Sequence, residues 1–161
     1  GVPYMGTTYA ESGRSYLVLG NSMVTSDDIS LEVADYLFDG RSAYDYAGYA
    51  VSSAGDIDGD GLDDIMIGAP GNDEWGGSAG KAYLYFGATL LDLPVNPVPF
   101  VDDNLDRSYD YGFVGSTDNE GLGSAVLAAD VNGDGFPDPI LGGFEYATDR
   151  GRVYIKHNTG L

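Results

Sequence analysis

The 161-residue chain contains no cysteine, a single histidine and only seven lysine and arginine residues in total. The absence of cysteine excludes disulfide bonds and metal sites built from thiolates. No segment approaches the roughly 20 consecutive apolar residues that a membrane-spanning helix requires. The shortage of cations leaves a formal net charge of −19 at pH 7. Binding to nucleic acid or to an anionic membrane surface is therefore disfavoured, because both would be repelled.

The residues that are abundant indicate an all-β protein with a packed core. Hydrophobic residues make up 43% of the chain, which is enough to bury a core, and there are 25 glycines and 13 tyrosines. Glycine permits tight turns, and tyrosine favours strands. Of the 26 acidic residues, 21 are aspartate. Outside the motifs described below, a solvated surface is the simplest interpretation of these acids.

The sequence repeats itself. Gly1-Val2-Pro3 corresponds to Gly68-Ala69-Pro70, an offset of 67 residues, and a further copy follows at a slightly larger offset. Such internal repetition is typical of solenoids and propellers. The glycines that match between copies are Gly13 with Gly80, Gly20 with Gly87, Gly40 with Gly115, Gly48 with Gly123, Gly68 with Gly142 and Gly80 with Gly151.

Each copy contains short runs of apolar, aromatic and β-branched residues, bounded by Gly, Asp, Asn and Pro. Such runs predict β-strands and are too short for helices. Four short strands in a repeat of roughly 70 residues favour the blades of a β-propeller over a sandwich. In the middle copy we expect strands at residues 50–54, 65–69, 82–86 and 111–114.

Two aspartate-rich loops, residues 56–64 and 130–138, carry side-chain oxygens at positions 1, 3, 5 and 9 and glycine at position 6. Calcium takes six to eight hard oxygen ligands at about 2.3–2.6 Å, and a backbone carbonyl at position 7 adds one more. Carboxylates this close together repel one another unless a cation lies between them. We therefore expect two Ca²⁺ sites. The candidate ligands are Asp56, Asp58, Asp60, Leu62 and Asp64 in the first loop, and Asp130, Asn132, Asp134, Phe136 and Asp138 in the second.

Other interpretations of the loops fit less well. An EF-hand needs a bidentate acid at position 12, where this chain has Ile67 and Leu141, and the residues after each loop indicate a strand. Magnesium demands a stricter octahedron, and zinc prefers histidine or cysteine. An acidic turn that binds no ion is the remaining alternative.

These motifs together resemble the FG-GAP repeats of integrin α-subunit-type β-propellers and their prokaryotic relatives. The resemblance implies blades of four antiparallel strands, with a structural calcium loop between strands 1 and 2. It also implies a partial propeller with one complete and two incomplete blades. The matching segments are residues 47–51, 55–64, 67–70 and 80–87. The expected division is a blade lacking its first strand at 1–40, a complete blade at 41–115 and a blade lacking its last strand at 116–161.

The last copy departs from the pattern of the middle one. It has Gly142-Gly143-Phe144 where Gly-Ala-Pro is expected, and Pro139 falls within a predicted strand, where it removes a backbone donor. Asn132 replaces one carboxylate, so we expect the second calcium site to be the weaker one.

No catalytic residues emerge from the sequence. The lone His157 has no acidic or nucleophilic partner nearby in sequence, and neither a nucleophile elbow nor a phosphate-binding glycine loop is present. The resemblance instead implies a non-enzymatic module for adhesion or for recognition of a protein or glycan ligand.

An alternative is an architectural subunit of a surface or extracellular assembly. In such a homo-oligomer or filament, chains would complete each other's blades through open sheet edges. A lyase or lipase with its catalytic domain elsewhere is a more distant possibility. Because free calcium is scarce in the cytosol, we expect an extracellular or cell-surface location.

Overall fold

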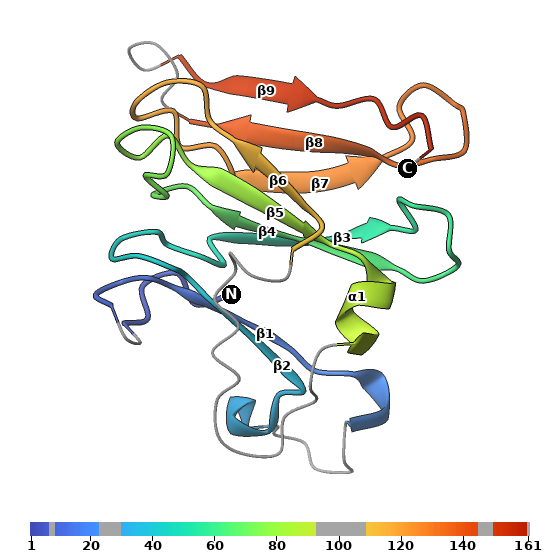
Figure 1. Cartoon of the computed structure of the whole chain (residues 1–161), viewed down its shortest axis with the longest axis horizontal. Coiled ribbons are helices and arrows are strands. Elements are labelled where there is room, and N and C mark those ends of the chain that lie inside the picture. Colours follow the sequence, from blue (N-terminus) through green and yellow to red (C-terminus); the bar gives the residue numbers. More distant parts are fainter. Residues whose placement is uncertain (7–8, 23–29, 93–108, 145–149, 161) are drawn as a thin grey trace.

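The computed structural model describes residues 1–6, 9–22, 30–92, 109–144 and 150–160. The strands of this part of the chain form three antiparallel sheets that follow one another in space (Figure 1). The expected all-β fold of a partial β-propeller is confirmed. The sheets consist of β1 (Arg14–Leu17) and β2 (Tyr36–Asp39); β3 (Ala50–Gly55), β4 (Asp64–Ala69), β5 (Lys81–Tyr85) and β6 (Tyr111–Val114); and β7 (Ala125–Ala129), β8 (Asp138–Gly143) and β9 (Arg152–Ile155).

The middle sheet is a four-stranded meander in the order β3-β4-β5-β6. Its strands match the four predicted segments to within one residue at each end. The β3–β4 pairing is regular from Ala50 opposite Gly68 to Ser53 opposite Ile65, and then shifts before Gly55. A bulge at this point bends the strand, and it lies where the first acidic loop begins. The residue boundaries of the three blades stay a prediction.

Strand β5 of the middle sheet is buried on both faces. Along β5, Tyr83 and Tyr85 pack into a cluster with Phe38 of β2, whereas Ala82 and Leu84 pack into a second cluster that includes Leu141 of β8. This alternation follows from the period of two along a strand. The sheets are thus stacked through two separate hydrophobic clusters, as neighbouring blades are.

Matched glycines bring neighbouring sheets together. An isolated parallel bridge joins Gly80 to Leu122, and the same bridge joins Gly13 to Ala47 one repeat earlier. A Cβ at Gly80 would lie 2.3 Å from the Leu122 nitrogen, and Gly80 has φ +84°. Only glycine fits such a close, left-handed position. This contact explains why these glycines recur at fixed spacing.

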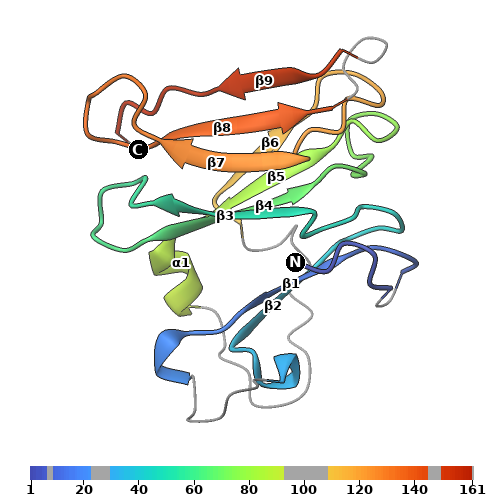
Figure 2. The ribbon, with the colours of Figure 1, turned by 180° about the vertical axis from the view of Figure 1, so that it is seen from behind.

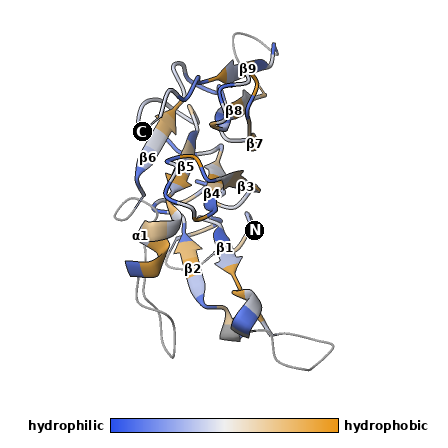
Figure 3. Ribbon diagram, turned by 90° about the vertical axis from the view of Figure 1, so that its right-hand side faces the viewer, coloured by the Kyte–Doolittle hydropathy of each residue, from blue (hydrophilic) through white to orange (hydrophobic). Residues whose placement is uncertain are grey.

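Helices are short in the described part of the chain. They are α1 (Gly87–Asp92) and the 3₁₀ turns η1 (Gly20–Ser22) and η2 (Leu31–Val33). The sequence did not predict α1. This helix exists because Leu90 is buried against the cluster around Tyr85, and Figure 3 colours it as largely hydrophobic. No helix found here has the length and apolar character needed to cross a membrane.

Pro139 lies within β8, the central strand of the last sheet. Its carbonyl accepts a hydrogen bond from the Lys156 N–H at 2.9 Å, so its polar groups face β9. β9 ends at Ile155, one residue before this contact. The backbone N–H that Pro139 lacks would therefore point toward the chain just beyond the end of β9. No hydrogen bond between paired strand residues is lost, so the sheet tolerates the proline.

Candidate cation-binding loops

The two acidic loops occupy equivalent places in their sheets. The first connects β3 to β4 and the second connects β7 to β8. Both project from the same side of the stacked sheets, which is visible in Figure 1 and from behind in Figure 2. Because strands in these sheets are antiparallel, the β4–β5 connection lies at the opposite end of the strands.

The first loop is curled by hydrogen bonds from its own backbone to its aspartates. The two carboxylate oxygens of Asp56 accept from the N–H groups of Gly59 and Gly61, at 2.8 and 2.9 Å. Asp58 accepts from the Asp60 N–H at 3.1 Å, and Asp60 accepts from the Leu62 N–H at 2.7 Å. These short-range bonds turn successive carboxylates inward, as a cation site requires.

The second loop repeats this pattern position by position. The two oxygens of Asp130 accept from Gly133 and Gly135, at 2.7 and 2.9 Å. Asn132 accepts from the Asp134 N–H at 2.9 Å, and Asp134 accepts from the Phe136 N–H at 2.9 Å. The shared backbone geometry follows from the shared Asp and Gly spacing. These backbone bonds, that of Gly135 foremost, hold the pKa of Asp130 below its ordinary value, although desolvation opposes them.

The aspartate at position 9 is fully buried in both loops. Asp64 accepts from the Ile57 N–H and from the Gly87 N–H, each at 2.7 Å. Asp138 accepts from Val131 at 3.1 Å and from Asn158 at 2.7 Å. Each carboxylate thus ties its loop to the chain just beyond the third strand of the same sheet.

Burial raises the pKa of Asp64 above its ordinary value. The hydrogen bonds from Gly87 and Ile57 oppose this rise, and the nearby charges of Asp58 and Asp60 add to it. A divalent cation between these groups would reverse the effect of the neighbouring charges, since it favours the ionised form.

Three of the predicted ligands in the first loop converge. Carboxylate oxygens of Asp56, Asp58 and Asp64 all lie within 4.8 Å of one another. Two oxygens bound to one calcium ion are at most about 5 Å apart, because each bond is about 2.3–2.6 Å long. The cluster therefore has the spacing and the hard donors that fit a divalent cation. Asp60 lies outside this group of three.

The second loop has one carboxylate fewer. Asn132 stands where the first loop has Asp58, and its amide group donates to Asp134 at 2.9 Å. This contact replaces a repulsion between two acids with a hydrogen bond. The ligand roles stay predictions in both loops. They concern Asp56, Asp58, Asp60, Leu62 and Asp64 in the first loop and Asp130, Asn132, Asp134, Phe136 and Asp138 in the second.

The sequence did not identify the backbone and side-chain partners of the buried acids. Asn158 is one of these: its side-chain amide donates to the Ile57 carbonyl at 2.6 Å, which links the last sheet to the first acidic loop. The available signal was their position, because Gly87 lies two residues beyond β5 and Asn158 lies three residues beyond β9.

The interpretation of the remaining acids as a solvated surface is wrong at several positions. Buried or half-buried acids outside the loops serve as hydrogen-bond acceptors, and two kinds recur between copies. Asp35 and Asp110 accept at 2.7 Å from the N–H groups of Leu19 and Phe86 respectively. The buried acids outside the loops are Asp35, Asp39, Asp45 and Glu120.

Asp45 and Glu120 form the second recurring pair, each three residues before a matched glycine. Burial raises the pKa of Asp45, and hydrogen bonds from Ser42 and Asn72 only partly offset this. Burial also acts to raise the pKa of Glu120. Hydrogen bonds from the Tyr154 hydroxyl and from Ser116 outweigh this effect, so the pKa of Glu120 is lowered. Equivalent carboxylates therefore differ in the direction of their pKa shifts.

The family comparison agrees with this geometry. The model of the FG-GAP repeat matches residues 47–85 and 122–155, which include both acidic loops. The chain contains FG-GAP repeats. The first matched segment begins at Ala47-Gly48 and contains Gly68-Ala69-Pro70.

The curated proteins to which the chain is similar are much longer than the chain. The chain is 32% identical over 146 residues to human phosphatidylinositol-glycan-specific phospholipase D, covering 86% of the chain and 16% of that protein. It is 33% identical over 128 residues to integrin alpha-PS2 of Drosophila melanogaster, covering 76% of the chain and 8% of the relative. It is 30% identical over 156 residues to integrin alpha-5 of Xenopus laevis, covering 94% and 13%. The chain thus spans less than a fifth of these relatives.

Proposed function

We propose that this chain is a non-enzymatic FG-GAP recognition module of an extracellular or cell-surface protein, in which two loops bind structural Ca²⁺. The observation that carries the proposal is the convergence of Asp56, Asp58 and Asp64 within 4.8 Å. The repetition of the same loop hydrogen bonds around Asp130 supports a second site.

The ion would stabilise the fold through the loop residues. Asp56 and Asp58 lie before β4, and Asp64 is its first residue. A cation held by all three would neutralise their repulsion and fix the entry to β4. Through the contact of Asp64 with the Gly87 N–H, the same ion would hold the end of β5. Binding free energy would then add directly to the free energy of unfolding.

Recognition is best assigned to the loops at the end of the sheets opposite the acidic loops. Trp75, in the β4–β5 connection, is 68% exposed and so is not a packing anchor. Tyr44 and Phe144 are also more than half exposed, in the β2–β3 connection and just after β8. Large exposed aromatic side chains are common anchors of protein interfaces. The similarity to integrin alpha subunits supports a protein ligand for this face.

We assign no catalytic role to this segment, although one of its relatives is named a phospholipase D. The aspartates at the predicted ligand positions of the two loops, and the buried acids outside the loops, accept hydrogen bonds from the protein itself. His157 is exposed, and its Nδ1 lies 3.7 Å from a carboxylate oxygen of Asp138, which already accepts two backbone hydrogen bonds.

Thermal unfolding of the chain in millimolar calcium and in chelator tests the structural role. At a calcium concentration of about 100 times Kd, one site adds about 2.7 kcal/mol to the free energy of unfolding. Asp58→Asn should remove part of this gain. Asp63→Asn is the matched control, because Asp63 is an exposed acid of the same loop outside the cluster. An equal response of wild type and D58N to calcium would contradict the proposal.

The size of the chain should be recorded in both conditions. A monomer in each supports the recognition module, whereas a calcium-dependent polymer favours an architectural subunit.

A further inference from the structure

Equivalent positions in the two interfaces between sheets carry very different side chains. Tyr85 lies opposite Ile65 in the middle sheet. In the last sheet the Lys156 N–H donates to Pro139. Ile65 and Pro139 each lie three residues before a matched glycine. Lys156 is therefore the structural counterpart of Tyr85.

The interface between the first and middle sheets is closed at this place. Tyr85 is fully buried, and its ring packs against Phe38 with 4.9 Å between ring centroids. Tyr36, the first residue of β2, is 5% exposed in the same cluster. An aromatic ring from β5 thus fills the space between the sheets.

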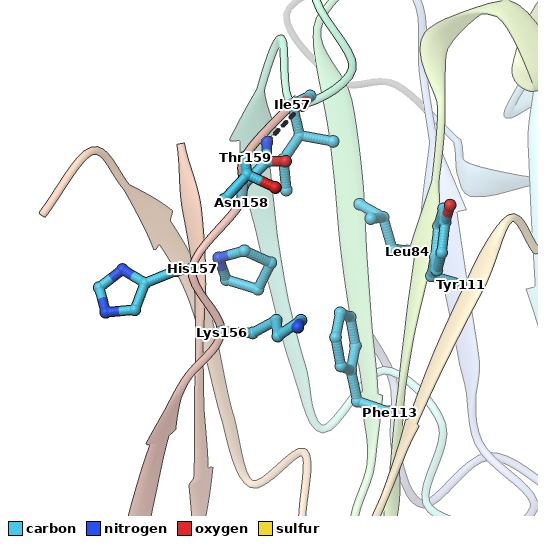
Figure 4. A pocket seen from close by; sticks show the side chains of 9 residues that line it. Ile57, Leu84, Tyr111, Phe113, Lys156, His157, Asn158 and Thr159 are labelled. Carbon is cyan, nitrogen blue, oxygen red and sulfur yellow. Dashed lines mark hydrogen bonds between the residues drawn. The ribbon is translucent and has the colours of Figure 1, made fainter. Parts of the chain in front are cut away.

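The interface between the middle and last sheets is open at the corresponding place. Phe113 is the counterpart of Phe38, and Tyr111, the counterpart of Tyr36, is 44% exposed. A pocket of about 150 Å³ lies here (Figure 4). Its apolar walls are formed by Ile57, Leu84, Tyr111, Phe113 and Pro139.

The pocket is lined by a lysine and by no acidic residue, although the molecule as a whole is strongly acidic. The chain has 26 acidic residues, yet none of the nine residues lining the pocket is Asp or Glu. Figure 4 shows Lys156 extending toward the ring of Phe113, whereas the His157 ring points away. Ion pairs of Arg14, Lys81 and His157 are found within the described segments, and none of these three involves Lys156. The Lys156 ammonium is thus available to an anion.

We propose that this pocket binds a small monocyclic aromatic acid. The aromatic ring packs against Phe113, as the Tyr85 ring packs against Phe38, and the carboxylate pairs with the Lys156 ammonium. A cavity of about 150 Å³ lined by Leu, Ile and Phe accommodates a benzene ring. A charge-assisted hydrogen bond at the rim then selects the acid over a neutral analogue. This site is distinct from the exposed aromatic loops, and its occupancy does not depend on the recognition function.

The first test titrates benzoate into the isotope-labelled, calcium-loaded chain and follows the backbone amide signals by NMR. We expect shifts at Phe113 and at residues 156–159, and weaker binding of the neutral analogue benzamide. Lys156→Met should weaken benzoate binding about tenfold, the loss of one charge-assisted contact, and leave benzamide binding unchanged. Arg150→Met removes an exposed cation outside the pocket and should leave both unchanged.

The second test fills the pocket from within. Lys156→Tyr places in the last sheet the residue that the middle sheet has, so we expect a higher Tm and loss of both benzoate and benzamide binding. Absence of benzoate shifts at the pocket would overturn the proposal, as would benzoate binding that Lys156→Tyr leaves intact. If Lys156→Tyr does not fold, the comparison of the wild type with Lys156→Met replaces it. Equal benzoate affinities of these two proteins would then overturn the proposal.

Discussion

The two acidic loops are nearly identical in their internal hydrogen bonds, whereas the two interfaces between sheets differ in character. At the four side-chain ligand positions, the loops differ only where Asn132 replaces Asp58. At the interfaces, a buried Tyr85 in one corresponds to an exposed Lys156 in the other. The loops depend on contacts within nine residues, so they repeat wherever the local sequence repeats. An interface depends on single side chains from distant strands, and it changes with each of them.

The largest expected effect is on the free energy of unfolding, and it tests the difference between the two interfaces. Tyr85→Ala should lower the free energy of unfolding by about 3–5 kcal/mol, because it leaves a cavity beside Phe38. Lys156→Ala, at the counterpart position, should change it by less than about 0.5 kcal/mol, since the side chain is exposed. Urea denaturation in saturating calcium measures both. Equal costs would show that the two positions are not equivalent in the way we describe.

A second prediction tests whether the loops are as alike as their geometry indicates. Asp64→Ala and Asp138→Ala each leave two backbone N–H groups without their acceptor. A buried unsatisfied group costs about 1–3 kcal/mol, so with two such groups each variant should lose about 2–6 kcal/mol of stability even in chelator. Similar losses in the two variants would support a common structural role for position 9. A loss seen only in calcium would assign these aspartates to the ion alone.

The sequence predicted those parts of the molecule that are encoded locally and repeated. The strands of the middle sheet and both acidic loops follow from the spacing of Gly, Asp and apolar residues. It did not predict Asn158 beside Ile57 or the burial of Glu120, because these contacts join residues far apart in sequence. The helix α1 was missed for a similar reason, since Leu90 is held by tertiary packing. Lys156 gave no signal until the strand register identified its counterpart.

A third prediction exchanges the one difference between the loops. Asn132→Asp should strengthen calcium binding at the second loop by about tenfold, and Asp58→Asn should weaken it at the first by a similar factor, because ligand charge tunes affinity in such loops. Tenfold corresponds to about 1.4 kcal/mol. Calorimetric titration of the two single variants and of the double exchange gives both affinities. If the double exchange leaves the stronger site at the first loop, a residue other than 58 and 132 sets the order.

The finest comparison concerns the equivalent buried acids Asp45 and Glu120. The pKa of Glu120 is lowered on folding, so its contribution to stability is present above the pKa of the unfolded chain and is lost as pH falls through the folded value. The pKa of Asp45 is raised, so the folded state binds more protons than the unfolded one. Stability therefore falls as pH rises from the unfolded to the folded value.

The free energy of unfolding, measured between about pH 3 and pH 6 in chelator, should therefore change in opposite directions when each group is made neutral. Relative to wild type, Glu120→Gln should lose the most stability at the upper end of this range, where Glu120 is ionised and accepts from Tyr154 and Ser116. For Asp45→Asn, the free energy of unfolding relative to wild type should instead be highest at the upper end of the range. There the wild type has to ionise a buried carboxyl group, and the variant does not. Parallel pH profiles for the two variants would mean that position in the repeat, and not the local hydrogen bonds, sets these pKa values.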